Sequence, residues 1–453
     1  MIKLPNEALA IINAVQKHGF EAYAVGGSVR DILMGRSTHG WDYTTNAIPE
    51  EILRMFPDSF YDNQFGTVGI KIRDKDEIVL DVFEITTYRS EQGYTDNRHP
   101  DKIKWGKTLK EDLSRRDFTI NSIAYDGKTF VDPYDGQKDL KEKIIRTVGV
   151  PSDRFAEDAL RMMRAVRIAS ELGFMIDPDT VAAIKTNAAL LKNISMERIR
   201  DELFRILASP FASDGILLLK NTGLLTYIVP ELEPAFSVEQ KSPNRHHIYD
   251  VGTHSVMALK HCPSPDPVVR LATLLHDIGK IKTYHKDESG QITFYNHEVV
   301  STKIAREIAF RLKLSKKQIE KVVTLIRWHQ FSVDERQTDT ALRRFVRHVG
   351  KENLDDMLAL RIGDRLGGGA TESSWRLELF KKRLIEVQKQ PFTVADLKID
   401  GFDVMKEYNC KPGPVIGKAL NALFAEVETN ALLNEKEALL KRLLELKNSI
   451  FTS

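Results

Sequence analysis

The sequence predicts an α+β protein in which an N-terminal head of mixed β-sheet and helices precedes an all-helical remainder. Strand patterns are concentrated in roughly the first 150 residues, in "EAYAV", "FGTVGIKI" and "EIVLDVFEIT". From Pro151 onward apolar residues recur at helical spacing, as in "AEDALRMMRAVRIASEL" and "KIAREIAFRLKLSKKQIEKVVTLIRWH". With 453 residues the chain is too long for a single core, so we expect several domains.

The changes of pattern along the chain predict four domains. They are a head over residues 1–148, a neck over 149–213, a helical body over 214–385 and a helical tail over 386–453. Within the helical part, "VEQKSPNRHHIYD" has the composition of a connection between domains. The stretch "QPFTVADLKIDGFD" indicates a second break, before a Leu- and Glu-rich C-terminal region.

The composition is that of an ordinary globular protein. Hydrophobic residues make up 42% of the chain and charged residues 29%, with a net charge of +2. The apolar runs are too short to span a membrane, and the N-terminus lacks the continuous apolar core of a signal peptide. Two cysteines, Cys262 and Cys410, cannot build a disulfide framework. We therefore expect a cytoplasmic protein with no membrane partner.

The stretch "AVGGSVRDILMG" places two glycines between a predicted strand and a predicted helix. Without side chains, Gly26 and Gly27 would let backbone N–H groups approach a phosphate near the positive end of a helix. Arg30 could add a charge-assisted hydrogen bond to the same phosphate. A Gly-Gly turn alone is more commonly structural, so this stretch gains meaning only together with the next one.

A candidate metal-binding strand follows in "RSTHGWDYTTNA". Side chains two residues apart in a strand point to the same face, so carboxylates at positions 40 and 42 would converge. Two divalent ions held there could activate an attacking 3′-hydroxyl and neutralise leaving pyrophosphate. Asp42 is present and Glu84 could approach it from a neighbouring strand, but position 40 is Gly40.

Three motifs together carry a family resemblance. "GGSVRD", the strand "GWDYTTNA" and "DLSRRDFTINSIAYD" resemble the class II tRNA nucleotidyltransferase and bacterial poly(A) polymerase family, above all its CCA-adding members. The similarity continues through "DRFAEDALRMMRAVRIASELGF", "SMERIRDELFRIL" and "KPGPVIGKALNAL", and hence over nearly the whole chain. The resemblance implies template-independent addition or repair of the 3′-terminal CCA of tRNA from CTP and ATP, with Mg²⁺ in a two-metal mechanism.

The resemblance also implies roles for individual residues. Asp42 and Glu84 would be the catalytic, Mg²⁺-binding carboxylates. The family strand normally reads Asp-x-Asp, so Gly40 stands where a metal-binding Asp is expected and transfer should be impaired. The implied nucleotide-binding residues of the head are Gly27, Ser28, Arg30, Arg116, Asp117 and Asn121. The stretch "YRSEQGYTDNRHPDKI" resembles the family's flexible loop, which favours an enzyme able to add the terminal A.

The neck motif "EDALR" carries candidate base-selecting residues. Asp158 and Arg161 are three residues apart and would share one helix face. Cytosine and adenine both offer an exocyclic amine to a carboxylate and a ring nitrogen to a guanidinium, whereas uracil and guanine present a carbonyl in place of the amine. The wrong base would leave the carboxylate unpaired, at a cost of roughly 1–3 kcal/mol. Glu157, Glu197 and Arg198 are expected to support this pair, which in isolation would be an ordinary surface ion pair.

The body contains a possible second metal centre. Seven of the twelve histidines fall between residues 246 and 297, too dense for chance scatter. The order of "THSV", "LLHDIGK", "YNHE", "RWHQ" and "RIGDR" resembles the HD phosphohydrolase superfamily. The resemblance implies a transition metal or Mg²⁺ bound by His254, His276, Asp277 and Asp364, with His297 and His329 holding a second ion or a phosphate. Water activated by the metal would attack a phosphoester, with Lys280 near the substrate phosphate, although HD folds also persist as inert scaffolds.

The tail motif "KPGPVIGKAL" places Gly413 and Gly417 around a predicted helix start. Its N–H groups could bind a tRNA backbone phosphate with help from Lys418, and a plain loop and helix start is equally compatible with the pattern. Three alternatives to CCA addition remain open on the sequence. The protein could be an A-only-adding enzyme or a poly(A) polymerase, a transferase-inactive protein acting through its HD site, or a tRNA-binding module.

Overall fold

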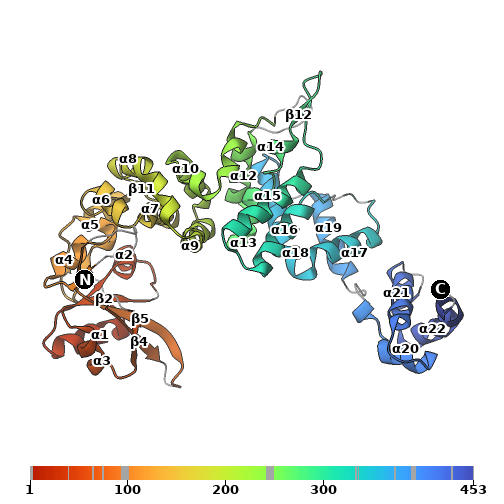
Figure 1. Cartoon of the computed structure of the whole chain (residues 1–453), viewed down its shortest axis with the longest axis horizontal. Coiled ribbons are helices and arrows are strands. Elements are labelled where there is room, and N and C mark those ends of the chain that lie inside the picture. The colour runs from red at the N-terminus through yellow and green to blue at the C-terminus, as the bar shows by residue number, and fades with distance from the viewer. Residues whose placement is uncertain are drawn as a thin grey trace. The chain divides into compact units, whose positions relative to one another are not determined.

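The computed structural model confirms the α+β class, with a mixed sheet in the N-terminal part followed by helices (Figure 1). It describes residues 4–38, 40–63, 66–73, 76–92, 102–240, 249–331, 334, 336–371, 374–388, 394–429 and 432–451. These residues form two compact units. The first consists of Met1–Ser237, Pro265–Arg270 and Glu307–Ser315, and the second of Val238–Ser264, Leu271–Arg306 and Lys316–Ser453. The division into four domains stays a prediction.

The head is built on a seven-stranded sheet with the order β3-β4-β5-β2-β1-β8-β9. Its strands are β1 Ala22–Val25, β2 Asp42–Thr45, β3 Ser59–Asn63, β4 Thr67–Arg73, β5 Val79–Thr87, β8 Ala124–Tyr125 and β9 Phe130–Val131. Neighbouring strands are antiparallel except β2 and β5, which are parallel. Two further strands, β6 Arg89–Gln92 and β7 Lys102–Trp105, form a separate antiparallel pair.

One face of the head sheet packs on two helices, and the opposite face carries polar groups beside a smaller apolar core that includes Val25 and Leu113. The helices α1 Asn6–Lys17 and α3 Pro49–Met55 cover the first face (Figure 1). Ile12 and Ile52 from these helices share a core with Tyr43 and Ile85 from the strands. Because side chains alternate along a strand, the neighbours of Tyr43 and Ile85 point to the opposite face. Asp42 and Glu84 are such neighbours.

The rest of the first unit is mainly helical. Its elements are α2 Gly27–Leu33, α4 Leu109–Ser114, η1 Thr119–Asn121, α5 Gly136–Glu142, β10 Ile144–Ile145, α6 Pro151–Glu157, α7 Leu160–Leu172, β11 Met175–Ile176, α8 Pro178–Asn187, η2 Ala188–Asn193, α9 Met196–Ala208, α10 Ala212–Asn221, α11 Leu225–Ile228 and η3 Pro230–Ser237. The helix α7 is buried along most of its length, as its apolar periodicity predicts, and ends at Gly173 in a left-handed conformation (φ 70°). It packs against α9 and α10.

The second unit is also helical, with one short hairpin. Its elements are α12 Val251–His261, α13 Pro267–Leu275, α14 Lys280–Thr283, β12 His285–Lys286, β13 Ile292–Thr293, α15 His297–Arg311, α16 Lys316–Trp328, α17 Asp339–Val349, η4 Lys351–Asn353, α18 Leu354–Gly367, α19 Trp375–Val387, η5 Val394–Asp396, α20 Gly401–Tyr408, α21 Pro414–Glu428 and α22 Lys436–Phe451. The helices α13 and α15 each contribute residues to both units. The last four elements share a hydrophobic core of their own.

The helices α12 and α18 approach each other unusually closely. A Cβ added at Gly363 would lie 2.6 Å from the carbonyl oxygen of Ala258, and one at Gly367 would lie 2.5 Å from the Ala258 nitrogen. Only glycine leaves room for such backbone contact. Among the described helices, none has both the length and the apolar character needed to cross a bilayer.

Candidate active site and metal centre

Two carboxylates meet on the polar face of the head sheet. The parallel register pairs Asp42 of β2 with Glu84 of β5, and the Glu84 N–H donates to the Trp41 carbonyl at 2.9 Å. Both residues reach solvent at this face. The Gly26 turn lies beside them, since a Cβ added there would be 3.1 Å from Asp42 Oδ2. Desolvation raises the pKa of Asp42, and the charges of Arg116 and Arg164 oppose that rise.

Gly40 does not lie in the strand, so the sequence prediction was wrong on this point. The strand β2 begins at Asp42, and Gly40 lies before it in the left-handed region, with φ +69°. The N–H of Gly40 donates to Asp81 Oδ2 at 2.9 Å. A Cβ added at Gly40 would meet nothing within 4 Å. The spacing of positions 40 and 42 predicts a shared face only for extended backbone, which this bend interrupts.

A chain of hydrogen bonds links the glycine turn to the neck. Arg30 Nη1 donates to Asn121 Oδ1 at 3.0 Å, and Asn121 Nδ2 donates to Asp117 Oδ1 at 3.3 Å. Asp117 Oδ2 then accepts two bonds from Arg164 of α7, at 2.8 and 2.5 Å. Burial disfavours the charged form of Asp117, but Arg164, Arg161 and Asn121 outweigh it and lower the pKa to about 2. The buried Asp117 carboxylate therefore links Asn121 and Arg30, next to the glycine turn, to helix α7. Ser28, next to this turn, donates to the Val25 carbonyl at 3.1 Å.

A second buried carboxylate orients the preceding arginines. Asp112 is fully buried and accepts from Arg115 at 2.8 Å and from Arg116 at 3.1 Å. The two arginines outweigh the cost of burial and lower the pKa of Asp112 to about 2. The two guanidinium groups are half-buried. Asp112 and Arg115 were not among the residues predicted from the sequence.

A cationic cavity of about 260 Å³ lies between residues 115–117 of the head and the neck helices α7 and α9. It is lined by Arg115, Arg116, Asp117, Asp158, Leu160, Arg161, Arg164 and Arg198. Five arginines thus face two aspartates, which suits a polyanion such as a triphosphate. Arg164 was missed by the sequence prediction. Its signal was available, because it follows Arg161 by three residues on an otherwise buried helix.

Asp158 and Arg161 line this cavity, but they do not sit on one continuous helix face as the sequence predicted. Asp158 is extended (φ −141°, ψ 105°) in the break between α6 and α7. Its Oδ2 accepts from Arg198 Nη2 at 2.8 Å, while Arg161 Nη1 donates to Glu157 at 2.6 Å. Glu157 and Arg198 therefore hold the two residues from either side, and Glu197 is exposed and does not line the cavity.

The second unit brings together the predicted HD residues from the helices α12, α15 and α18, from the segment between α13 and α14, and from His329 directly after α16. His254 Nε2 lies 3.2 Å from Asp364 Oδ1 and 3.5 Å from Asp277 Oδ2. His276 Nε2 lies 3.3 Å from Asp277 Oδ2 and 3.6 Å from Asp364 Oδ1. The other oxygen of Asp277, Oδ1, lies 3.1 Å from His297 Nε2 and 3.7 Å from His329 Nε2.

The histidines are oriented as metal ligands. In His276, His297 and His329, Nδ1 lies 2.7 or 2.8 Å from the carbonyl oxygen three residues earlier. A carbonyl only accepts, so Nδ1 carries the hydrogen and a neutral ring offers the lone pair of Nε2. The Nε2 atoms of His276 and His297 are buried and make no hydrogen bond. Nitrogen lone pairs that face carboxylate oxygens in a buried cluster fit a divalent cation.

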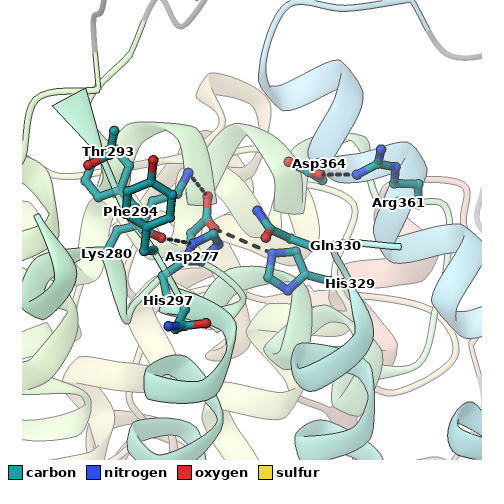
Figure 2. Close-up of a pocket in the computed structure, with 11 residues that line it drawn as sticks. Asp277, Lys280, Thr293, Phe294, His297, His329, Gln330, Arg361 and Asp364 are labelled. Atoms are coloured by element: carbon teal, nitrogen blue, oxygen red, sulfur yellow. Dashed lines mark hydrogen bonds and ion pairs between the residues drawn. The ribbon is translucent and has the colours of Figure 1, made fainter. Parts of the chain in front are cut away.

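A cavity of about 360 Å³ opens onto this cluster. Figure 2 shows His297, His329 and Lys280 directed toward Asp277, with Arg361 paired to Asp364. Lys280 Nζ lies 2.7 Å from Asp277 Oδ2, and Arg361 Nη1 lies 3.3 Å from Asp364 Oδ2. Two positively charged side chains, Lys280 and Arg361, therefore line the cavity next to the candidate metal ligands, where a phosphate could bind.

The tail motif is at a helix start, as predicted. Gly413 precedes α21, Gly417 lies in its first turn, and Lys418 follows. All three are exposed, and their RNA-binding role stays a prediction. The predicted flexible loop falls mostly on residues 93–101, outside the described part of the chain. Cys262 and Cys410 form no disulfide bond.

Three family models match the chain in succession. Residues 22–146 match the poly A polymerase head domain, and residues 173–236 match the probable RNA and SrmB-binding site of polymerase A. Residues 290–443 match tRNA nucleotidyltransferase domain 2.

Two relatives and a solved structure agree with these matches. The CCA-adding enzyme of Ligilactobacillus salivarius is 34% identical over 98% of both chains. The CCA-adding enzyme of Geobacillus kaustophilus is 44% identical over 224 residues, which span 49% of this chain and only 54% of that protein. The crystal structure of the Bacillus stearothermophilus CCA-adding enzyme in complex with CTP has a TM-score of 0.72 and 30% identity, covering 98% of both chains.

We expect Arg164→Ala to destabilise the protein by roughly 2 kcal/mol, because it leaves the Asp117 carboxylate buried without its main counter-charge. The value stays below that for a fully buried pair, since Arg164 is 37% exposed. Chemical denaturation of the full chain measures the change. Arg205→Ala, which removes a more exposed arginine paired with Glu171, is the matched control and should change stability by less than about 0.5 kcal/mol. Equal effects of the two substitutions would contradict the proposed importance of the buried pair.

We expect metal binding at the HD cluster to release a proton and to strengthen as the pH rises. Burial lowers the pKa of His276, but Asp277 and Asp364 outweigh it and raise the pKa to about 10. A cation must therefore displace a proton, so affinity should rise by up to about tenfold per pH unit between roughly pH 7 and 9. Calorimetric titration with Ni²⁺ or Mn²⁺ in buffers of different ionisation enthalpy counts the protons. His276→Gln should abolish the release, and pH-independent binding to the unmodified protein would refute this view.

Proposed function

The chain belongs to the CCA-adding enzyme family, and from that premise we propose that it adds or repairs the 3′-terminal CCA of tRNA from CTP and ATP. The observation that carries the proposal is the position of the cationic cavity. Its walls include Asp117, which is hydrogen-bonded through Asn121 and Arg30 to the glycine turn beside Asp42. One connected network can thus bind a triphosphate and also contain Asp158 and Arg161, the residues expected to select the base. No nucleic-acid template is required, because protein side chains select the base.

The reaction joins a tRNA 3′-oxygen to the α-phosphorus of the nucleotide, while the bond to pyrophosphate breaks and the hydroxyl proton is lost. Divalent cations, which the family implies, would be held by Asp42 and Glu84 and would lower the pKa of the hydroxyl and neutralise the pyrophosphate. The residues fit such ions only in part, because position 40 supplies no carboxylate. Arg116 and the neighbouring arginines would hold the triphosphate in line with the attacking oxygen.

Base selection follows from Asp158 and Arg161. A carboxylate only accepts hydrogen bonds, so Asp158 would take the exocyclic amine of C or A and would be left facing an oxygen in U or G. Asp158 Oδ1 accepts from the Leu160 N–H at 3.0 Å, and Arg161 Nη2 donates to the Arg115 carbonyl at 3.0 Å. Both side chains are therefore held in place before a nucleotide binds, which favours selectivity.

We expect the chain to bind CTP and ATP but to transfer them on the order of 100-fold more slowly than its Gly40→Asp variant, because one metal-binding carboxylate is missing. Single-turnover assays give the rates. The substrates are tRNA lacking all three terminal nucleotides and tRNA ending in CC, each offered one nucleotide at a time.

The outcomes of this assay separate the alternatives. Addition of two C and then one A supports the proposal, whereas A added only to tRNA ending in CC indicates an A-only enzyme, and long A tracts indicate a poly(A) polymerase. Equal rates for the glycine and aspartate forms would refute the metal argument. Tight tRNA binding without turnover at either site would leave a binding module.

The HD cluster supports a second candidate function, metal-dependent hydrolysis of a phosphoester. The observation that favours it is the pair of buried Nε2 atoms without hydrogen bonds, facing carboxylates at the base of a cavity that also contains Lys280 and Arg361. A cation held by His254, His276, Asp277 and Asp364 would supply an activated water, and His297 and His329 would hold a second ion or a phosphate. The two cationic side chains would bind the phosphate oxygens.

We expect the full chain to hydrolyse nitrophenyl phosphate or a 2′,3′-cyclic nucleotide when Ni²⁺, Mn²⁺ or Mg²⁺ is added. His276→Ala and Asp277→Ala should reduce the rate at least about 100-fold by removing metal ligands. The exposed His285, on β12 outside the cluster, provides the matched control His285→Ala. A rate unchanged by the ligand substitutions would show that the hydrolysis does not arise at this cluster.

A further inference from the structure

The bend at Gly40 is fixed by a side chain that the family resemblance did not point to. Asp81, near the start of β5, accepts the Gly40 N–H through Oδ2 at 2.9 Å, and its Oδ1 accepts the Val82 N–H at 2.8 Å. We propose that Asp81 is a positioning residue that holds residue 40 in the left-handed bend and so keeps it out of the metal-ligand position. The proposal rests on the proposed transfer function.

The bend is attached to β5 at two successive residues. Asp81 holds the Gly40 N–H, and the next carbonyl, that of Trp41, accepts from the Glu84 N–H. Trp41 is itself buried, with 3% of its surface exposed. The backbone of residue 40 therefore cannot rotate into extended conformation without losing the bond to Asp81.

Backbone conformation, not space, limits what residue 40 can be. A Cβ there would meet nothing within 4 Å, so a larger side chain is not excluded by contact. A residue other than glycine, however, is disfavoured in the left-handed conformation, with Asp and Asn tolerated best. A side chain at position 40 would share the face of Asp42 only after the bend straightened.

Charge adds to the conformational effect. An aspartate introduced at position 40 would carry its carboxylate on the same residue whose N–H is bound by Asp81, so two like charges would be close together. Gly40 and Asp81 are therefore a coupled pair. Asp81 stabilises the glycine conformation and opposes both the geometry and the charge of an aspartate at position 40.

Hydrogen–deuterium exchange of the full chain tests the positioning directly, without any catalysis. Asp81→Ala removes the acceptor, so the peptide containing Gly40 should exchange roughly fivefold to tenfold faster. Asp81→Asn keeps an oxygen that can accept and should change the exchange much less. Asp58→Ala, at a 56% exposed carboxylate outside the site, is the matched control and should leave this peptide unchanged. Unchanged exchange in Asp81→Ala overturns the proposal.

A cycle of transfer rates tests the coupling. In the Gly40→Asp background, Asp81→Ala should raise the rate by about fivefold or more, because the hydrogen bond and the negative charge of Asp81 no longer oppose the extended form. The Mg²⁺ concentration for half-maximal rate should fall by a similar factor. With glycine at position 40, Asp81→Ala should bring no such gain. Equal effects in both backgrounds overturn the coupling, whereas faster exchange in Asp81→Ala without transfer by any variant refutes the transfer function and leaves the positioning intact.

Discussion

The parallel pairing of β2 with β5 is the constraint on which the candidate transfer site depends. It places Asp42 directly beside Glu84, and the alternation of side chains turns both away from the core that Tyr43 and Ile85 form with the helices below. The same pairing brings the residues before β2 alongside the start of β5, where Asp81 lies. The register of β2 and β5 thus determines the placement of both carboxylates and the conformation of Gly40, where a third carboxylate is missing.

Acidic side chains hold the arginines of the cationic cavity in place before a ligand binds. Each arginine in its wall has an acidic partner, namely Asp112 for Arg115 and Arg116, Glu157 for Arg161, Asp117 for Arg164, and Asp158 for Arg198. Long side chains that are already held lose little freedom when an anion binds. The acids neutralise part of the charge but leave an excess of arginine in the cavity wall. The arrangement therefore combines order with a positive potential, as recognition of a triphosphate requires.

Local pattern and motif order predicted the fold class and the gathering of the His and Asp side chains into one cluster. The strands around Asp42 and Glu84 were evident from β-branched runs. The order of six His and Asp residues along the chain predicted their cluster, although they come from distant segments. Spacing failed where the backbone leaves regular structure. Asp158 was assigned to a continuous helix face, but the break between α6 and α7 makes it extended. Gly40 was assigned to a strand, but a long-range bond to Asp81 bends it. The spacing of Arg164 from Arg161 was visible in the sequence, but its pairing with Asp117, 47 residues earlier, was not, because periodicity does not register long-range contacts.

The close contact of α12 with α18 depends on two glycines, which therefore affect the distance between the residues that these helices carry. Gly363 and Gly367 flank Asp364 on α18, and they let that helix lie against the backbone of Ala258, one turn after His254 on α12. A single methyl group at either position would wedge the helices apart and widen the gap between a histidine and an aspartate without altering either. The spacing of the candidate metal ligands therefore depends partly on two residues that have no side chain.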